Sequence, residues 1–459
     1  MKLALIQPCI GRYVDRPYIR TWQMEPLSLA TLAAATPGDV DVVLYDDRLE
    51  PIPFDAPVDA VAISVETYTA RRAYQLASDF RARGVPVIMG GFHASLCPDE
   101  VAEYADAVVV GEADRIWPEV IDDVRHGRLQ ERYRALGRVP LAGLQADRSV
   151  FAGKRYLPIG LVEASRGCRF GCEFCAISSF YGATFAWRPV DEVVAEMVRV
   201  GRERKLIFLV DDNLAGDLDH ARELLAAMAG ERLSWVGQCS VNAARDEDFT
   251  ALLARSGCRA VLIGFESLDA ANLAVMNKRF NAGEHGYEAA LANLARHRIA
   301  VYGTFVFGYD HDTERSFARA VDFAVRHRFF IAAFNHVVPF PGTPLYARLA
   351  AEGRLLHERW WLEPSYRFNE LAFRPARLEP QRLRALCLEA RRSFYALPAI
   401  LRRATGRANR RPGFALKNYW PINLLHRAEV DRRDNHPLGD LGWRGSWRPV
   451  AGRERASCG

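Results

Sequence analysis

The 459 residues exceed what one hydrophobic core usually organises, so we expect two or three domains. A composition of 49% hydrophobic and 25% charged residues is typical of globular proteins and excludes a largely disordered or low-complexity chain. The formal net charge of +5 is unevenly spread, with +12 from residue 374 to the end and −7 before it.

The first 125 residues alternate apolar, strand-like runs with helical patterns. The expected strands are Lys2–Pro8, Val40–Tyr45, Asp59–Val65, Val85–Met89 and Ala107–Val110, and the expected helices between them include Pro26–Ala35 and Ala70–Arg83. Such alternation predicts a parallel, doubly wound sheet of Rossmann type over residues 1–126, with ligands bound at the carboxyl ends of the strands. That edge would carry the segments 64–67, 90–93 and 111–114.

A second alternating series follows an arginine-rich, glycine-containing stretch at 127–157 that we interpret as a linker. The expected strands of this series are Leu161–Ser165, Leu206–Val210, Trp235–Val241, Ala260–Phe265, Val301–Phe307 and Ala332–Val338, with helices such as Val190–Arg204 and Phe317–Arg328. Six strand-helix units predict a partial (β/α)6 barrel over residues 158–345, with its chemistry at the carboxyl ends of the strands.

Residues 346–459 form the basic part of the chain, and a clear helical pattern there spans about Pro380–Ala404. We expect a small, mainly helical carboxyl-terminal module. Its positive charge favours a solvated helical face over a nucleic-acid surface, because regular interleaving of aromatic and basic residues is missing.

The expected cellular compartment depends on whether the sequence contains a transmembrane or a secretory segment. No window approaches 18 consecutive apolar residues, and Pro8 and Arg12 interrupt the first apolar run before a secretory segment could form. Nine cysteines without paired regular spacing do not indicate a disulfide framework. We therefore expect a cytoplasmic protein without a transmembrane segment.

The strongest chemical signal is the Cys-x3-Cys-x2-Cys spacing of Cys168, Cys172 and Cys175, directly after an expected strand. A zinc site would need a fourth ligand, commonly from a second pair, and no such pair is present. An iron-sulfur cubane held by three thiolates keeps one iron free for chemistry. Structural zinc and coincidentally spaced buried cysteines are the alternatives.

This spacing, with the aromatic Phe174 before the last cysteine and the position after a first barrel strand, resembles the radical S-adenosylmethionine superfamily. The resemblance implies that the three cysteines ligate a [4Fe-4S] cluster, that the open iron chelates S-adenosylmethionine, and that reductive cleavage releases a 5′-deoxyadenosyl radical. It also implies that Phe174 lies against the adenine.

Further cofactor contacts are expected after the later barrel strands. Where many relatives have Gly-Gly-Glu, this chain has Asp-Asp-Asn, which can accept from an ammonium group but can equally cap a helix. The candidate S-adenosylmethionine contacts are Asp211, Asp212, Asn213, Gln238, Asn242, Gly264 and Glu266. Tyr302, Tyr309, His311 and His336 fall at or after the last two strands, where they would be substrate contacts or structural residues.

The amino-terminal domain resembles the cobalamin-binding domain of one branch of the superfamily. The residues that carry this resemblance are Ser64, Thr67, Gly90, Gly91, His93, Gly111 and Glu112. Small residues there would let a nucleotide tail approach the sheet edge. The Asp-x-His-x-x-Gly motif of some cobalamin proteins is absent from residues 1–125, and its one match, at 434–439, lies in the basic tail. We therefore expect cobalamin, if bound, to lack a histidine beneath the cobalt.

The resemblance implies a cobalamin-dependent radical methyltransferase acting on an unactivated carbon of a small-molecule or lipid-like biosynthetic intermediate, with an external donor such as a flavodoxin or ferredoxin. The alternative is a radical cyclase, rearranging enzyme or oxidoreductase in which cobalamin carries electrons or is absent. Methylthiotransferases are disfavoured because residues 1–125 contain only Cys9 and Cys97 instead of a second cysteine triad. A non-catalytic, nucleic-acid-associated protein is also disfavoured.

Overall fold

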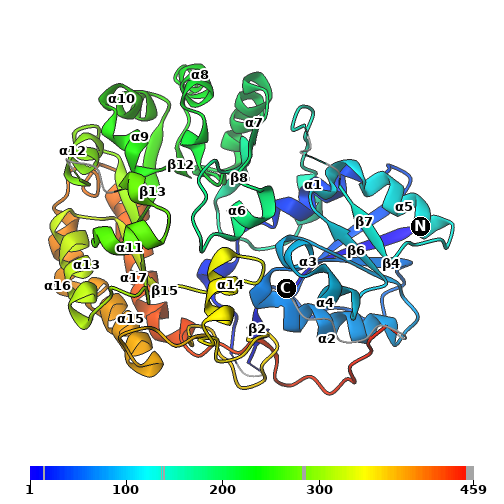
Figure 1. Cartoon of the computed structure of the whole chain (residues 1–459). Helices are drawn as coiled ribbons and strands as arrows, with labels where there is room; N and C mark the ends of the chain where they lie inside the picture. Colours follow the sequence, from blue (N-terminus) through cyan, green and yellow to red (C-terminus); the bar gives the residue numbers. More distant parts are fainter. Residues whose placement is uncertain (14–15, 136, 138–139, 282–285, 451–459) are drawn as a thin grey trace.

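The computed structural model describes residues 1–450 except 14–15, 136, 138–139 and 282–285. Two α/β units lie side by side, and helices α6 (Ala176–Tyr181) and α14 (Pro344–Ala351) lie between them (Figure 1). The fold class expected from the sequence, a doubly wound domain followed by a partial barrel and a helical module, is confirmed.

The amino-terminal unit is a parallel sheet in the order β3-β1-β4-β5-β6-β7. Its strands are β1 (Lys2–Gln7), β3 (Asp41–Asp46), β4 (Ala60–Ser64), β5 (Val87–Gly90), β6 (Ala107–Val110) and β7 (Arg132–Arg134). The helices around it are α1 (Leu27–Ala35), α2 (Ala70–Arg81), α3 (Phe92–Leu96), α4 (Pro98–Ala102) and α5 (Trp117–Arg125). Separate apolar cores cover the two faces, as expected for strands that are apolar throughout.

Strand β7 was not expected, because it lies in the arginine-rich stretch interpreted as a linker. Arg132 and Arg134 flank the buried Tyr133, and this short strand pairs with β6 at the edge of the sheet. An edge strand of three residues with a single buried side chain carries almost no periodic signal.

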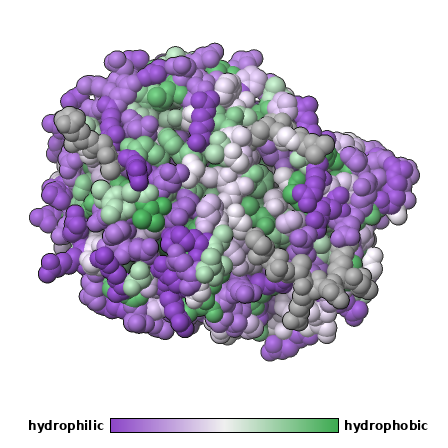
Figure 2. Space-filling model, in the orientation of Figure 1, coloured by the Kyte–Doolittle hydropathy of each residue, from purple (hydrophilic) through white to green (hydrophobic). Residues whose placement is uncertain are grey.

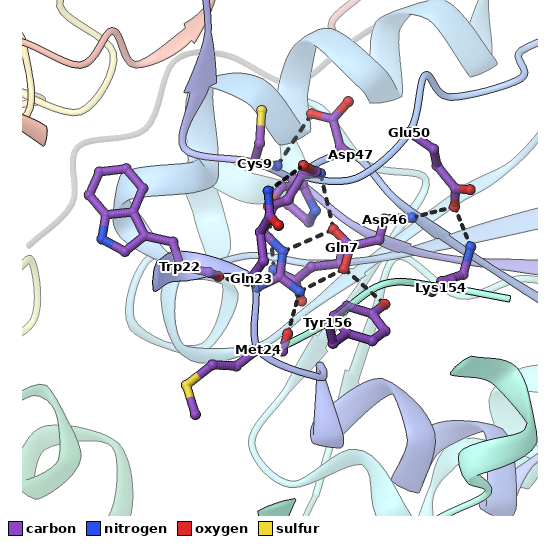
Figure 3. Close-up of polar contacts among 12 residues, drawn as sticks. Gln7, Cys9, Trp22, Gln23, Met24, Asp46, Asp47, Glu50, Lys154 and Tyr156 are labelled. Atoms are coloured by element: carbon purple, nitrogen blue, oxygen red, sulfur yellow. Dashed lines mark hydrogen bonds and ion pairs between the residues drawn. The ribbon is translucent and has the colours of Figure 1, made fainter. Parts of the chain in front are cut away.

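A buried polar network holds residues 22–24 and Tyr156 against the ends of β1 and β3 (Figure 3). Arg48 donates to both carboxylate oxygens of Asp46 and to the backbone carbonyls of Trp22 and Met24. Tyr156 donates to Asp46 over 3.0 Å. The ring of Trp22 projects away from this network (Figure 3). The network therefore fixes the backbone of Trp22 and leaves its indole outside the network.

The second unit is a six-stranded parallel sheet in the order β15-β14-β13-β12-β11-β8. Its strands are β8 (Gly160–Val162), β11 (Ile207–Leu209), β12 (Trp235–Gln238), β13 (Cys258–Glu266), β14 (Ala300–Phe307) and β15 (Ile331–His336). Its covering helices are α7 (Val190–Glu203), α8 (Leu218–Met228), α10 (Glu247–Arg255), α12 (Glu288–Arg296) and α13 (Glu314–Arg326), with short α9 (Val241–Arg245) and α11 (Ala270–Val275) at strand ends. This confirms the expected (β/α)6 series.

One insertion in the barrel was not expected. Between β8 and α7 the chain forms an antiparallel hairpin of β9 (Ser165–Gly167) and β10 (Phe185–Trp187), which encloses the cysteine loop and α6. The insertion therefore begins and ends on paired strands.

The carboxyl-terminal helices are α15 (Pro380–Phe394), α16 (Leu397–Ala404) and α17 (Trp420–Arg433), the last preceded by a single π-helical turn at Ala415–Tyr419. The sequence pattern predicts one helical region over about Pro380–Ala404, but the structure has two helices there. Pro398 causes the break, because in a continuous helix its ring would clash with the carbonyl of Phe394.

After α17 the chain returns to the amino-terminal unit. Strand β16 (Gly439–Asp440) pairs with β2 (Gly11–Arg12), and Trp443 donates to Asp79 on α2. His436 is buried against the carbonyl of Gly11 at 2.9 Å. The histidine of the tail's Asp-x-His-x-x-Gly match thus contacts the backbone of this strand pair, and residues 451–459 of the expected module lie outside the described residues.

Hydrophilic side chains cover most of the periphery in the view of Figure 2, while hydrophobic side chains show mainly over the barrel half. Within the described residues, no helix has both the length and the apolar character needed to cross a bilayer.

Candidate functional site

The cysteine loop lies between β9 and α6 at the carboxyl-terminal side of the barrel. Cys168 follows β9 directly, and Cys175 is the residue that precedes the first turn of α6. Charge on Cys175 raises the pKa of both Cys168 and Cys172, so the three sulfur atoms lie within electrostatic range of one another. The structure therefore brings the three predicted ligands together.

Burial raises the pKa of the Cys172 thiol to about 12, and the nearby Lys278 ammonium opposes this shift. Burial likewise raises the pKa of Cys168. Without a metal both groups are thiols at neutral pH, so binding of iron displaces their protons. In the described part of the chain, no three His, Cys, Asp or Glu side chains surround one point closely enough to hold a single ion. A cubane does not need one shared point, because each thiolate ligates a separate iron.

The predicted Asp-Asp-Asn segment fixes the start of the cysteine loop. Asp211 accepts from the backbone N–H of Ala164 and from the Ser165 hydroxyl, at 2.7 and 2.6 Å. Asp212 accepts from the backbone N–H of Gly167 at 2.7 Å. Asn213 directs its amide Nδ2 toward Sγ of Cys168, at 3.8 Å.

Burial raises the pKa of Asp211 to about 7, against the hydrogen bonds from Ser165 and Ala164, which lower it. These contacts give Asp211 a supporting role in the strap from 164 to 167. Asn213 is the member of the segment that faces a cysteine.

Two polar atoms at the start of α9, which follows β12, are buried without a hydrogen-bond partner among the described residues. They are Oγ of Ser240 and Oδ1 of Asn242. Gln238, the other predicted contact here, donates instead to the backbone carbonyl of Asp212 over 2.6 Å. Unpartnered buried oxygens are costly, so this position fits a polar ligand that donates hydrogen bonds, such as a sugar or an ammonium group.

Gly264 and Glu266 end β13 at a break in its register with β14. Glu266 has a left-handed backbone, with φ of 61°, and its Oε1 lies 2.6 Å from Nζ of Lys278. A Cβ at position 264 would lie 2.1 Å from Oε1 of Glu266 and 2.8 Å from that ammonium. Gly264 is therefore needed to leave room for the Glu266–Lys278 pair.

Lys278 was missed by sequence analysis. Burial lowers its pKa, but Glu266 and the nearby Cys172 outweigh burial, so the pKa lies above its usual value and the side chain is cationic. Asn277 was also missed, although it donates to the carbonyl of Gly171 inside the cysteine loop at 2.7 Å. Both residues lie about 100 positions beyond the loop, where no local pattern connects them to it.

A cavity of about 460 Å³ lies at the carboxyl edge of the amino-terminal sheet, and we call it the sheet-edge cavity. The predicted residues that line it are Ser64, Gly90, Gly91, Gly111 and Glu112. Gly91 has φ of 104°, and a Cβ there would lie 2.8 Å from the carbonyl of Val65. The cavity lies next to the topological switch point and has glycines at two strand ends, which is where doubly wound sheets bind nucleotide-like ligands.

Thr67 and His93, which were also predicted, lie outside the lining of this cavity. His93 is fully buried, with Nδ1 3.2 Å from Oγ1 of Thr67 and Nε2 3.1 Å from Oε1 of Glu100. Glu100 also accepts from the Trp361 indole over 2.8 Å. His93 thus belongs to a buried polar cluster that binds the carboxyl-terminal module. Among the described residues, no histidine lines the cavity.

The sheet-edge cavity also has a wall from the barrel. Arg166 of β9 lines it and pairs with Glu112 at 3.1 Å, with Asp114, and with Glu163 at 3.0 Å. Phe180 and Tyr181, the last residues of α6, line it as well. The helix that begins after Cys175 thus ends in this cavity, six residues later.

On its other side the cysteine loop borders a second cavity, of about 410 Å³, through Phe174. Tyr302 and His336, two of the candidate substrate contacts, line this second cavity. Tyr309 lies next to the ring of Phe174, with centroids 6.5 Å apart. His311 does not line the cavity.

Residues 162–324 match the profile of the Radical SAM superfamily. Bacteriochlorophyllide d C-12(1)-methyltransferase of Chlorobaculum tepidum is 32% identical over 411 residues, which cover 87% of this chain and 87% of that protein. Bacteriochlorophyllide d C-8(2)-methyltransferase of the same organism is 28% identical over 82% of this chain and 87% of its own length. Hopanoid C-2 methylase of Rhodopseudomonas palustris is 25% identical over 73% of this chain and 66% of its own length.

Among solved structures, the radical S-adenosylmethionine methyltransferase TsrM from Kitasatospora setae, with cobalamin and a [4Fe-4S] cluster bound, superposes with a TM-score of 0.62. The match covers 86% of this chain and 81% of TsrM at 17% identity. At that identity the likeness concerns the fold, and it includes both α/β units in the same order.

Proposed function

The chain belongs to the radical S-adenosylmethionine superfamily of enzymes, and from this premise we propose that it is a cobalamin-dependent methyltransferase acting on an unactivated carbon of a small-molecule or lipid-like biosynthetic intermediate. The relatives that cover most of the chain, named above, are methyltransferases or methylases. Their names favour methyl transfer over the cyclase, rearrangement or oxidoreductase alternative.

The observation that carries the proposal is the position of α6. The helix starts directly after Cys175 and ends with Phe180 and Tyr181 in the sheet-edge cavity. Six residues of α-helix span about 9 Å, at 1.5 Å per residue. A cluster on the cysteine loop and a cofactor in the sheet-edge cavity would therefore be close neighbours.

Each cofactor has residues that would hold it. Cys168, Cys172 and Cys175 would ligate the cluster, and Ser240, Asn242 and Glu266 would bind polar groups of S-adenosylmethionine. The glycine-lined edge at Gly90, Gly91 and Gly111 would admit cobalamin. When bound, these groups would supply a 5′-deoxyadenosyl radical and a transferable methyl group.

The protein's own contribution is alignment and protection from water. Asn213 would direct a neutral amide N–H, and Lys278 a positive ammonium, toward the thiolates, and such contacts tune a cluster's potential. We further propose that no histidine lies beneath the cobalt, in keeping with the histidine-free lining of the described part of the sheet-edge cavity.

We expect an external electron donor, such as a flavodoxin or ferredoxin, because the cleavage of S-adenosylmethionine consumes an electron that the chain itself does not generate. A reducing compartment would keep the three thiols available for iron, so we place the enzyme in the cytoplasm.

The test is anaerobic reconstitution with iron, sulfide and cobalamin, followed by assay of 5′-deoxyadenosine and S-adenosylhomocysteine under strong reductant. Cys172→Ala should lose the cluster and form no 5′-deoxyadenosine. Cys258→Ala is the matched control, because Cys258 is a buried thiol at the start of β13, outside the loop.

Deoxyadenosine formed only with the intact loop supports the radical assignment, and S-adenosylhomocysteine formed only with cobalamin supports methyl transfer. Failure to assemble any iron-sulfur cluster would overturn the proposal.

A further inference from the structure

The second cavity, which we call the β15 cavity, lies between the last barrel strands and the carboxyl-terminal helices. Its walls include Tyr302 of β14, His336 of β15, Arg391 of α15 and Arg433 of α17, and Trp22 of the amino-terminal unit contributes an indole. Each part of the chain therefore contributes to one cavity.

Aromatic and aliphatic side chains dominate this lining. Trp22, Tyr68, Phe174, Tyr302 and Phe368 are among the rings that border it. Aromatic rings arranged around a cavity favour a ligand with a flat apolar body, because ring faces and edges pack well against one another.

Arg391 is the charged group that stands out in this apolar lining. Nε donates to the backbone carbonyl of Phe334 at 3.0 Å, and Nη2 donates to Oδ1 of Asn335 at 2.9 Å and of Asn369 at 3.4 Å. These acceptors are all neutral. In the described part of the chain, Arg391 forms no ion pair within 4.0 Å, and Nη1 has no acceptor.

A buried arginine that only supports the fold looks different, as Arg403 shows. Its Nη1 donates to the carbonyls of Phe329 and Phe330, and its Nη2 donates to Phe394 and Asn423. Arg403 is fully buried and lines none of the cavities described above. Arg403 leaves its Nε without an acceptor, as Arg391 leaves its Nη1, but Arg391 differs because it borders open space.

The other charges near the cavity largely cancel. Arg433 pairs with Glu429 at 3.1 Å, and Asp434 pairs with Arg384 at 2.9 Å. Burial lowers the pKa of His336 to about 4 and that of His426 to about 3, so both imidazoles are neutral at pH 7. Among the described lining residues none is acidic. Arg384 also pairs with Glu370 at 3.5 Å, so the surrounding charges balance overall. Of the two described cations that line the cavity, Arg391 is the one without an ion-pair partner.

We propose that the β15 cavity binds the methyl acceptor, and that the acceptor is an apolar, ring-containing molecule with one carboxylate that pairs with Arg391. This inference rests on the proposed function for the identity of the ligand as methyl acceptor. One guanidinium without an ion pair matches a monoanion better than a phosphate dianion, and Nη1 is the nitrogen that can donate to the carboxylate, because Nε and Nη2 already have acceptors.

The position of the cavity relative to the cysteine loop agrees with this role. Phe174, the neighbour of Cys175, lines the same cavity as Arg391. A molecule anchored at α15 and extending along β15 therefore comes up against the loop that would carry the radical source.

Arg391 is accordingly a binding residue for the acceptor, and the test is a binding measurement that needs no turnover. Equilibrium dialysis of the full-length, reconstituted protein would compare 4-phenylbutyric, 4-(naphthyl)butyric and 4-(1-pyrenyl)butyric acids with their primary amides. At least one acid should bind tenfold or more tightly than its amide, because the amide cannot neutralise Arg391.

Two variants and one control show whether the preference for the acid depends on Arg391. Arg391→Gln should abolish the preference for the acid. Asn335→Asp keeps the size of the side chain and supplies an internal carboxylate at the 2.9 Å contact, so it should abolish the preference even if Arg391→Gln folds poorly. Arg392→Gln should leave the preference unchanged, because Arg392 is exposed and pairs with Asp431 on the surface.

Equal binding of every acid and its amide, or an acid preference that survives in both variants, would overturn the inference. Tighter binding of the phosphate monoester 4-(1-pyrenyl)butyl phosphate would overturn the assignment of a carboxylate. Because dialysis requires neither 5′-deoxyadenosine nor methyl transfer, failure of the proposed function would show in the reconstitution assay and failure of this inference would show here.

Discussion

Nη1 of Arg166 lies 3.1 Å from Oε1 of Glu112, so the hairpin that starts the cysteine loop is ion-paired with the ligand edge of the amino-terminal sheet. Arg166 contacts Asp114 and Glu163 as well, which places one buried cation among three carboxylates. The relative position of the two units, and with it the shape of the sheet-edge cavity, depends on this side chain.

Replacement of Arg166 by Gln should therefore destabilise the protein strongly. Removing one partner of a buried ion pair costs about 3–5 kcal/mol, because the remaining charges stay buried. Thermal unfolding should begin several degrees lower, and the purified protein should retain less cobalamin. Arg169→Gln is the matched control, because Arg169 forms an exposed pair with Asp217, and such pairs contribute roughly 0–1 kcal/mol. Equal effects of the two substitutions would contradict the interface role of Arg166.

A substitution at Gly91 tests whether the sheet-edge cavity binds cobalamin. Gly91→Ala should lower both stability and cobalamin content, since the new Cβ would meet the Val65 carbonyl at 2.8 Å on a backbone with φ of 104°. Gly84→Ala provides the comparison, because Gly84 also has a positive φ, of 75°, but no atom lies within 4 Å of its Cβ position. Gly84→Ala should cost only the backbone strain of about 1–2 kcal/mol and leave cobalamin binding intact. Full cobalamin occupancy in Gly91→Ala would argue against this cavity.

Gly264→Ala should weaken the binding of S-adenosylmethionine without loss of the cluster. The added methyl group would displace Glu266 and Lys278 but would not touch the three thiols. We expect a loss of about tenfold in affinity, which corresponds to about 1.4 kcal/mol and is typical of one polar contact. Equilibrium dialysis with reconstituted protein measures it, and the iron content serves as the check on the cluster. Gly230→Ala, with open space around its Cβ, should bind normally.

Sequence patterns were sufficient for the two sheets. In the amino-terminal sheet, β1, β4, β5 and β6 are almost wholly buried apolar runs, and in the barrel the long strands β13 and β14 alternate buried and half-buried residues. Sequence patterns failed at short elements with few buried residues, such as β7 and the β9–β10 hairpin. They also missed partners contributed from a distance. The three cysteines lie within eight residues of each other, whereas Lys278 and Arg391 reach the site only through the packing of the barrel and of α15.

His93 was predicted at the ligand edge together with its neighbours, but its side chain does not line the cavity. The segment from Gly90 to His93 lies at the predicted edge, but the glycines line the cavity while the histidine turns inward to Thr67 and Glu100. A helix that starts at Phe92 rotates successive side chains by about 100°, so adjacent residues face different surroundings.

The stability of the cysteine-loop strap should depend on pH through Asp211. Burial raises the pKa of this carboxyl to about 7, compared with about 3.9 for an unfolded aspartate. Between these two pH values the unfolded state has lost the proton that the folded state keeps. Folding is therefore favoured at low pH, and the contribution declines as the pH rises from about 4 to about 7.

Asp211→Asn removes this titration while preserving the size of the side chain and one acceptor for the N–H of Ala164. The wild-type unfolding temperature should therefore fall more steeply than that of the variant as the pH rises from 5 to 7, because only the wild type must bury a developing negative charge. Differential scanning calorimetry across this range measures the two slopes. Asp217→Asn is the comparison, since the hydrogen bond from the backbone of His220 holds the pKa of Asp217 below its usual value, and its stabilising effect is already complete at pH 5. Parallel slopes for wild type and Asp211→Asn would show that Asp211 is ionised in the folded protein throughout this range.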